Sequence, residues 1–110
     1  MLSDLVSDIE VYGTMIDLLP RYKERAEVAE IFIRRELIDA ALGETAASET
    51  VVHQLDEADA KLLGHRSLLL RRFPEVFRLR APNIPRRYWW WYLDEGPQVR
   101  EEALAATREP

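Results

Sequence analysis

The 110-residue sequence contains no cysteine, which excludes disulfide bonds, thiolate zinc sites and cysteine nucleophiles. Its four glycines are isolated from one another, so no glycine-rich phosphate-binding loop is present. No apolar run approaches the roughly 20 residues that a membrane-spanning helix needs. The first residues include acidic side chains and lack the basic start of a secretory signal. We therefore expect a cytoplasmic protein that neither spans nor binds a membrane.

Sequence motifs of catalysis are also missing. There is no nucleophile elbow and no order of serine, histidine and aspartate that is typical of a known triad. His53 and His65 are twelve residues apart, which separates them by about 18 Å along a helix. No Glu-x-x-His motif of the kind found in di-metal bundles occurs. The sequence predicts a non-enzymatic protein with no catalytic residue, metal ligand or cofactor. A metal-dependent helical enzyme is the least favoured alternative, kept because carboxylates are plentiful.

What the sequence does have is enough apolar material for one core. It is 47% hydrophobic and 32% charged, and a chain of this length buries about two-thirds of its unfolded surface. The hydrophobic fraction excludes intrinsic disorder, and the length of the chain favours a single domain spanning residues 1–110.

The first helix is predicted from an apolar stripe with steps of three and four residues, the period of one helix face. Its members are Leu2, Leu5, Ile9, Tyr12, Ile16 and Leu19. Pro20 must kink or end this helix because its ring clashes with the preceding turn. Residues 3–42 therefore form either one kinked helix or, as we favour, two helices that meet at a tight corner.

The second helix is predicted over residues 21–42, with Gly43 as its C-cap. Its main core stripe is assigned to Tyr22, Ala26, Ala29, Ile33, Leu37 and Ala40. Ile31, Ile38 and Leu42 lie on the opposite side of the helical wheel. A helix that is apolar on two sides is either central in the fold or in contact with another subunit. The second stripe is therefore a candidate homodimer contact.

A third helix is predicted over residues 48–73, with Thr45 or Ser48 available as a cap. Asp59 and Arg66 fall inside its apolar stripe. A charge on a core face must reach solvent or be paired, so these two residues either extend to the edge of the core or join a buried polar network.

The C-terminal part, residues 74–110, is expected to pack on the helical core of residues 3–73. Three prolines indicate an irregular crossing over residues 75–85. Pro85 and Gly96 then frame a short aromatic helix, and a last helix reaches about residue 107. The predicted fold is all-α: a small helical bundle or helical hairpin, a Pro/Arg-rich crossing and an aromatic-capped short C-terminal helix.

Charge is unevenly distributed along the chain. Residues 66–87 hold seven arginines and one acid, so this stretch carries +6 and the rest of the chain carries −11. A run of three tryptophans follows directly. Since arginine pairs with carboxylates and phosphates and stacks on aromatic rings, this region is the candidate binding surface. Its residues are Arg71, Arg72, Arg78, Arg80, Arg86, Arg87, Trp89, Trp90 and Trp91.

Three interpretations of this region remain open. In the first, the arginines face the protein's own acids while the tryptophans complete the core. In the second, the arginines and tryptophans form a protein-binding hot spot. In the third, the arginines bind the phosphates of a nucleic acid and the aromatic rings stack on its bases. Side chains of successive residues point in different directions, so at least one tryptophan should be exposed or at a contact. The favoured function is a protein-interaction module that binds a protein partner or itself as a homodimer. A nucleic-acid-binding accessory or regulatory protein is the alternative.

Overall fold

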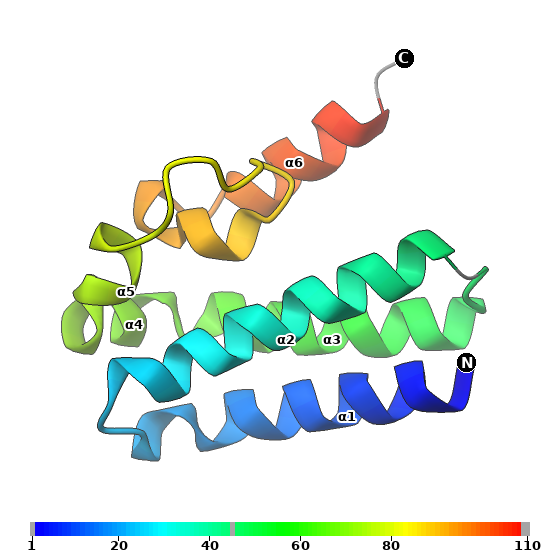
Figure 1. Ribbon diagram of the computed structural model, residues 1–110, viewed down its shortest axis with the longest axis horizontal. Helices are drawn as coiled ribbons and strands as arrows, with labels where there is room; N and C mark the ends of the chain where they lie inside the picture. Colours follow the sequence, from blue (N-terminus) through cyan, green and yellow to red (C-terminus); the bar gives the residue numbers. More distant parts are fainter. Residues whose placement is uncertain (1, 45, 109–110) are drawn as a thin grey trace.

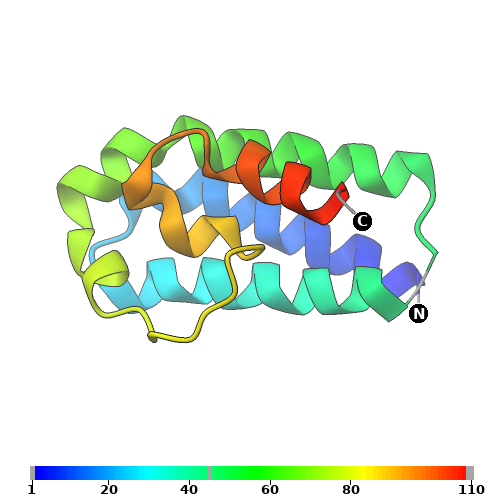
Figure 2. The ribbon, with the colours of Figure 1, turned by 90° about the horizontal axis from the view of Figure 1, so that it is seen from above.

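The computed structural model describes residues 2–44 and 46–108, and side chains from residue 4 to residue 106 apart from Thr45. The fold is all-α, as the sequence predicts. The helices α1 (Leu2–Leu18), α2 (Arg25–Glu44) and α3 (Glu49–Gly64) run side by side (Figure 1). A C-terminal layer, formed mainly by η2 (Trp89–Glu95) and α6 (Val99–Arg108), lies across one side of them. Figure 2 shows this layer from above, over α2 and α3.

The corner between α1 and α2 confirms the role of Pro20. A short 3-10 turn, η1 (Leu19–Arg21), holds Pro20 in its first turn, where a missing N–H costs nothing. The chain then reverses, so that α1 and α2 pack as neighbours. The predicted stripe of α1 is buried in the part of the chain whose side chains are described, that is, from Leu5 through Leu19. The side chain of Leu2 lies outside the described ones.

Helix α3 begins after Ser48, one of the two residues that the sequence offers as its cap. The Ser48 hydroxyl accepts a hydrogen bond from the Val51 N–H, which satisfies one of the free donors of the first turn. The other candidate cap, Thr45, lies outside the described residues. The single long helix predicted over residues 48–73 is wrong, because α3 ends at Gly64 and α4 (Arg66–Arg72) follows after His65. The break lets α4 turn towards η2, which it contacts.

The C-terminal part is more regular than predicted. Pro74 does not simply end a helix but opens another, α5 (Pro74–Arg78), because proline fits the first helical position. Residues 79–88 form the irregular crossing, and the aromatic run is helical, as a 3-10 segment. Gly96 has a φ of 140° and turns the chain from η2 into α6. Helix α6 packs chiefly on η2 and points away from α2 and α3 towards its C-terminal end (Figure 1).

The two faces of α2 are the reverse of the predicted ones. Ile31 and Ile38 are fully buried and Leu42 is half-buried, so the predicted homodimer stripe is the stripe that faces the chain's own core. Ile33 and Leu37, assigned to the core, are exposed. The sequence could not decide between the faces, since both are apolar and only the position of α1, α3 and η2 selects one. Gly43 lies inside α2 and is not its C-cap.

Candidate interaction surfaces

The tryptophans form a roof over the helical core. Trp89 and Trp90 are buried and meet edge to face, with ring centroids 5.5 Å apart. Trp91 is half-buried, packs edge to face on Phe32 and donates a hydrogen bond of 2.9 Å to Glu36. None of the three is exposed, and only Trp91 is not fully buried, so the expectation that at least one is exposed or at a contact stays a prediction that rests on Trp91. Trp89 and Trp90 act as core residues and do not offer an open contact surface.

Under this roof lies a buried carboxylate that the sequence flagged as Asp59. Arg35 donates from Nε and Nη2 to the two carboxylate oxygens of Asp59, at 2.9 and 3.1 Å. The hydroxyl of Tyr12 donates to the same carboxylate at 2.7 Å. The Arg35 guanidinium also lies 4.5 Å from the centre of the Trp90 ring. Three helices and the aromatic segment thus meet at one ion pair, which is the buried polar network the sequence left as one of two options.

The ionisation of this network follows from its burial. Burial raises the pKa of Tyr12 well above its ordinary value, and the negative charge of Asp59 raises it further. Burial alone would lower the pKa of Arg35, but the charge of Asp59 and its hydrogen bonds outweigh that effect and raise it. Tyr12 therefore stays a neutral donor and Arg35 stays charged. The arrangement offers no activated nucleophile and no free base.

Several of the arginines of residues 66–87 are engaged in contacts within the chain. Arg72 donates at 2.7 Å to the backbone carbonyls of both Pro20 and Tyr22. Arg80 bonds the Trp91 carbonyl and Asp94, at 2.8 and 2.6 Å. Such contacts occupy part of the fork of donors that arginine would present to a ligand, although Arg72, bonded only to carbonyls, has no acidic partner. Arg66, which is half-buried, also donates a hydrogen bond within the chain, to the Leu93 carbonyl at 2.6 Å.

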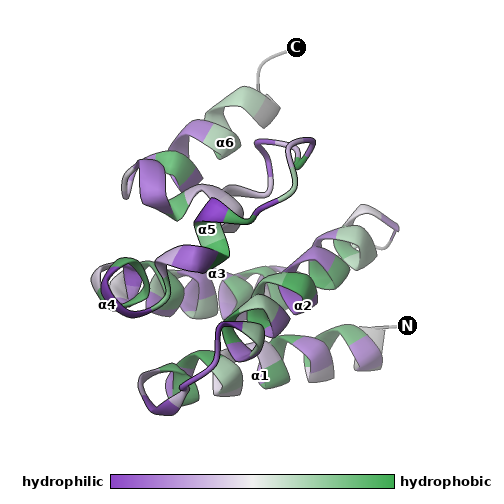
Figure 3. Ribbon diagram, turned by 60° about the vertical axis from the view of Figure 1, so that its left-hand side comes forward, coloured by the Kyte–Doolittle hydropathy of each residue, from purple (hydrophilic) through white to green (hydrophobic). Residues whose placement is uncertain are grey.

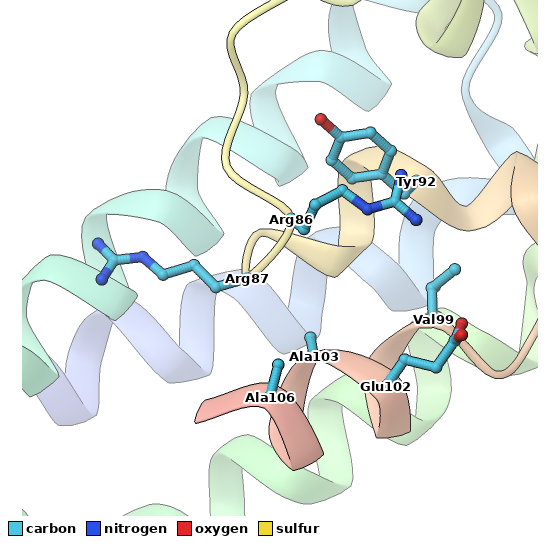
Figure 4. Close-up of a pocket in the computed structure, with 7 residues that line it drawn as sticks. All are labelled: Arg86, Arg87, Tyr92, Val99, Glu102, Ala103 and Ala106. Atoms are coloured by element: carbon cyan, nitrogen blue, oxygen red, sulfur yellow. The ribbon is translucent and has the colours of Figure 1, made fainter. Parts of the chain in front are cut away.

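Arg86 and Arg87 border a pocket of about 390 Å³ between the crossing and α6 (Figure 4). The Arg86 guanidinium lies 4.3 Å from the Tyr92 ring centre and forms two hydrogen bonds with Glu95. Arg87 extends out of the pocket towards α2, where it lies 3.7 Å from Asp39. Small apolar side chains of α6 form the opposite wall. Both arginines already have acidic partners, so neither contributes an unpaired positive charge to the pocket.

A different surface is left open on the outer face of α2. Ile33 is 49% exposed and Leu37 is 59% exposed. Figure 2 places α2 along one long edge of the molecule, and Figure 3 shows hydrophobic residues along its ribbon. The exposed positions Ala26, Glu30, Ile33, Leu37, Ala40 and Glu44 recur at steps of four and three residues. That repeat is the seam of a coiled coil. We call these six residues the outer seam of α2.

Unpaired positive charge gathers at one end of the molecule. Among the described basic side chains, seven take part in ion pairs, and those that do not are Arg21, Lys23, Arg25, Arg66, Arg71, Arg72 and Arg78. Apart from Arg66, they lie at the η1 corner, the start of α2, α4 and α5, which share one end of the fold (Figure 1). We call these six residues the cationic end. The sequence pointed to three of them, and the fold adds the other three.

Other candidate chemistry finds no support in the described part of the chain. His53 pairs with Glu57 at 2.8 Å on the exposed face of α3, and no cluster of three or more His, Asp or Glu among the described residues could hold a metal ion. No described helix is both long and apolar enough to cross a membrane.

No family model, curated protein or solved structure matches the chain.

Proposed function

We propose that this chain is a non-enzymatic protein-interaction module that forms a homodimer through the outer seam of α2. The observation that carries the proposal is the exposure of Ile33 and Leu37 at coiled-coil spacing on a helix whose other face is fully buried. Exposed apolar side chains that line up in this way gain free energy when they pack against a complementary surface.

A second copy in antiparallel orientation is such a surface. If two α2 helices cross between Ile33 and Leu37, Ile33 of one copy lies over Leu37 of the other, and the small Ala40 faces Glu30. The same register sets Ala26 opposite Glu44. Alternation of large and small side chains allows two helices to interlock. The contact is isologous and closes on itself, as in most homodimers.

Charge at the two ends of α2 favours the same orientation. Residues 21–27 carry the cations Arg21, Lys23 and Arg25 against two acids, whereas the last turns of α2 carry the acids Asp39 and Glu44. An antiparallel pair sets the basic end of each helix beside the acidic end of the other, twice in the dimer. The charged residues at the centre, Arg34 and Glu36, are already bonded to Asp8 and Trp91 within the chain.

The test is the mass of the protein in solution. Multi-angle light scattering from micromolar to millimolar protein should show twice the chain mass of 12.8 kDa. Ile33→Glu with Leu37→Glu should give a monomer with the same helical circular dichroism, since both residues are exposed. Val52→Glu, at another exposed apolar position on α3, is the matched control and should remain dimeric. A wild-type monomer throughout this range would overturn the proposal.

A charge exchange tests the orientation. Arg25→Glu should weaken the dimer, and adding Glu44→Arg to it should restore the affinity. If the second change weakens the dimer further, the helices do not pair in the antiparallel register, whatever the outcome for Ile33 and Leu37.

A further inference from the structure

We infer that the cationic end is a docking site for an acidic segment of a partner protein, one that carries an apolar side chain among its carboxylates. This site shares Ala26 with the outer seam of α2 and Arg25 with the proposed antiparallel contact, while its other residues lie outside that seam. It joins two stretches of chain that are far apart in the sequence, residues 21–25 and 71–79, and the inference rests on their charge and on the apolar pocket beside them.

Contacts place these pieces next to one another. Arg72, at the end of α4, bonds the carbonyls of Pro20 and Tyr22, so its neighbours on the surface include Arg21 and Lys23. Arg25 lines a pocket together with Val76 and Leu79, which brings the start of α2 to α5. Arg78 directly precedes Leu79. The exposed cations therefore form one continuous end of the molecule.

The charge of this end is not cancelled locally. The six cations face three nearby acids, Glu24, Glu27 and Glu75. The carboxylate of Glu27 accepts the backbone N–H groups of Lys23 and Glu24 at 3.1 and 3.0 Å at the exposed start of α2, and three acids still leave an excess of three positive charges. A chain with a net charge of −5 thus keeps a locally positive surface, which attracts an acidic ligand.

An apolar anchor point lies beside the cations. Leu79 is 65% exposed, the highest value among the large apolar residues whose side chains are described. It borders a pocket of about 240 Å³ whose other lining residues are the apolar Ala26, Ala29, Val76 and Trp91 and the charged Arg25 and Glu75. A single leucine or similar side chain would fill such a space while flanking carboxylates reach Arg71 and Arg78. An apolar anchor within a charged rim is the usual anatomy of a protein contact.

The same features favour a protein segment over a nucleic acid. Binders of single strands combine a positive groove with exposed aromatic rings on which bases stack. Trp89 and Trp90 are buried, and Trp91 is half-buried at the border of the pocket. The side chain exposed at the cationic end is aliphatic, so it can pack on an apolar side chain but cannot stack on a base.

The experiment uses three fluorescein-labelled probes and the full chain in fluorescence anisotropy. The first probe is a peptide of aspartate and glutamate with one central leucine, the second has serine in place of that leucine, and the third is an oligothymidylate. The leucine peptide should bind tightest. Arg71→Glu and Arg78→Glu should each weaken it about threefold or more, whereas Lys61→Glu on the exposed face of α3 should not.

Leu79→Ser should remove the preference for the leucine peptide over the serine peptide and leave the remaining binding unchanged. Absence of peptide binding at low salt, or equal weakening by Lys61→Glu, would overturn the inference. Tighter binding of the oligothymidylate would also overturn it and assign the cationic end to nucleic acid. The Ile33→Glu, Leu37→Glu chain should bind the leucine peptide at least as tightly as the wild type, because the proposed homodimer would place Arg25 and Ala26 beside a second copy. Peptide binding by this chain therefore tests the docking site whether or not the homodimer forms.

Discussion

Arg35 on α2 and Asp59 on α3 form a bidentate ion pair in the centre of the fold, closed from above by Trp90. Both partners are almost inaccessible to solvent. A carboxylate in this position is tolerated because Arg35 and Tyr12 satisfy it with three hydrogen bonds. The pair therefore makes α1, α2, α3 and η2 depend on one another.

Removing one partner of this pair should destabilise the protein strongly. Arg35→Leu leaves Asp59 buried without its counter-charge, which we expect to lower the free energy of unfolding by about 3–5 kcal/mol. Urea denaturation followed by circular dichroism measures the change. Asp56→Asn, one turn earlier on α3 and exposed, breaks only the ion pair with Arg100 and should cost less than about 1 kcal/mol. Equal losses in the two variants would contradict the central role of Asp59.

Trp90 should be the most sensitive position of the aromatic run. Its side chain is fully buried, so Trp90→Ala leaves a cavity over Arg35 and should cost about 3–5 kcal/mol. Thermal unfolding of this variant and of Leu79→Ala provides the comparison. Because Leu79 is exposed, its truncation should change stability by no more than about 0.5 kcal/mol. A near-neutral Trp90→Ala would show that the aromatic segment does not cover the core.

Glu95 should contribute to stability in a pH-dependent way. The hydrogen bonds from Arg86 lower the pKa of Glu95 below its ordinary value of 4.5. A pKa that is lower in the folded state stabilises the protein above pH 4.5 and loses this effect as the pH falls through the folded-state value. Glu95→Gln should therefore be less stable than the wild type at neutral pH, and the gap should close in acid.

Denaturation at a series of pH values checks the Glu95 prediction, with Glu101→Gln on the exposed side of α6 as the control. The control should track the wild type at every pH. A gap between Glu95→Gln and the wild type that persists unchanged below the ordinary glutamate pKa would show that the Arg86 contact is not its cause.

Two glycines should respond to alanine in opposite directions. Gly96 has a φ of 140°, and a Cβ built there would lie 2.1 Å from the Gln98 side chain, so Gly96→Ala should cost about 1–3 kcal/mol. Gly43 lies within α2 with open space around it, and Gly43→Ala should stabilise the protein by about 0.4–1 kcal/mol. Thermal unfolding of both variants is the measurement, and a stabilising Gly96→Ala would contradict the turn described for the start of α6.

The sequence predicted local structure well where one signal dominated. The stripe of α1 and the corner at Pro20 follow from spacing and from the proline ring, and both are observed. The break at His65 follows Gly64, the last residue of α3, but the apolar stripe continues into α4, so a single glycine did not outweigh the helical period in the prediction. The prediction that Pro74 only ends a helix missed the start of α5, because proline both ends and begins helices.

The candidate surfaces were less accessible to sequence reasoning. Arg71, Arg72 and Arg78 are recognisable by their charge, but their association with Arg21, Lys23 and Arg25 depends on the Arg72 contacts across the chain. Arg80, Arg86 and Arg87 look equivalent to them in the sequence and yet are paired with acids. Nothing in the local sequence distinguishes a paired arginine from a free one.

By itself the sequence determined that this chain is helical, that it has one aromatic-rich C-terminal segment, and that Asp59 must either reach solvent or be paired, because helix period, proline geometry and the cost of a buried charge are local properties. The tertiary structure alone decided that Ile31 and Ile38 face inward while Ile33 and Leu37 face solvent. It also decided which arginines keep their charge unpaired. Both outcomes depend on which elements pack together, and a helix with two apolar faces acquires an inside only when its neighbours are in place.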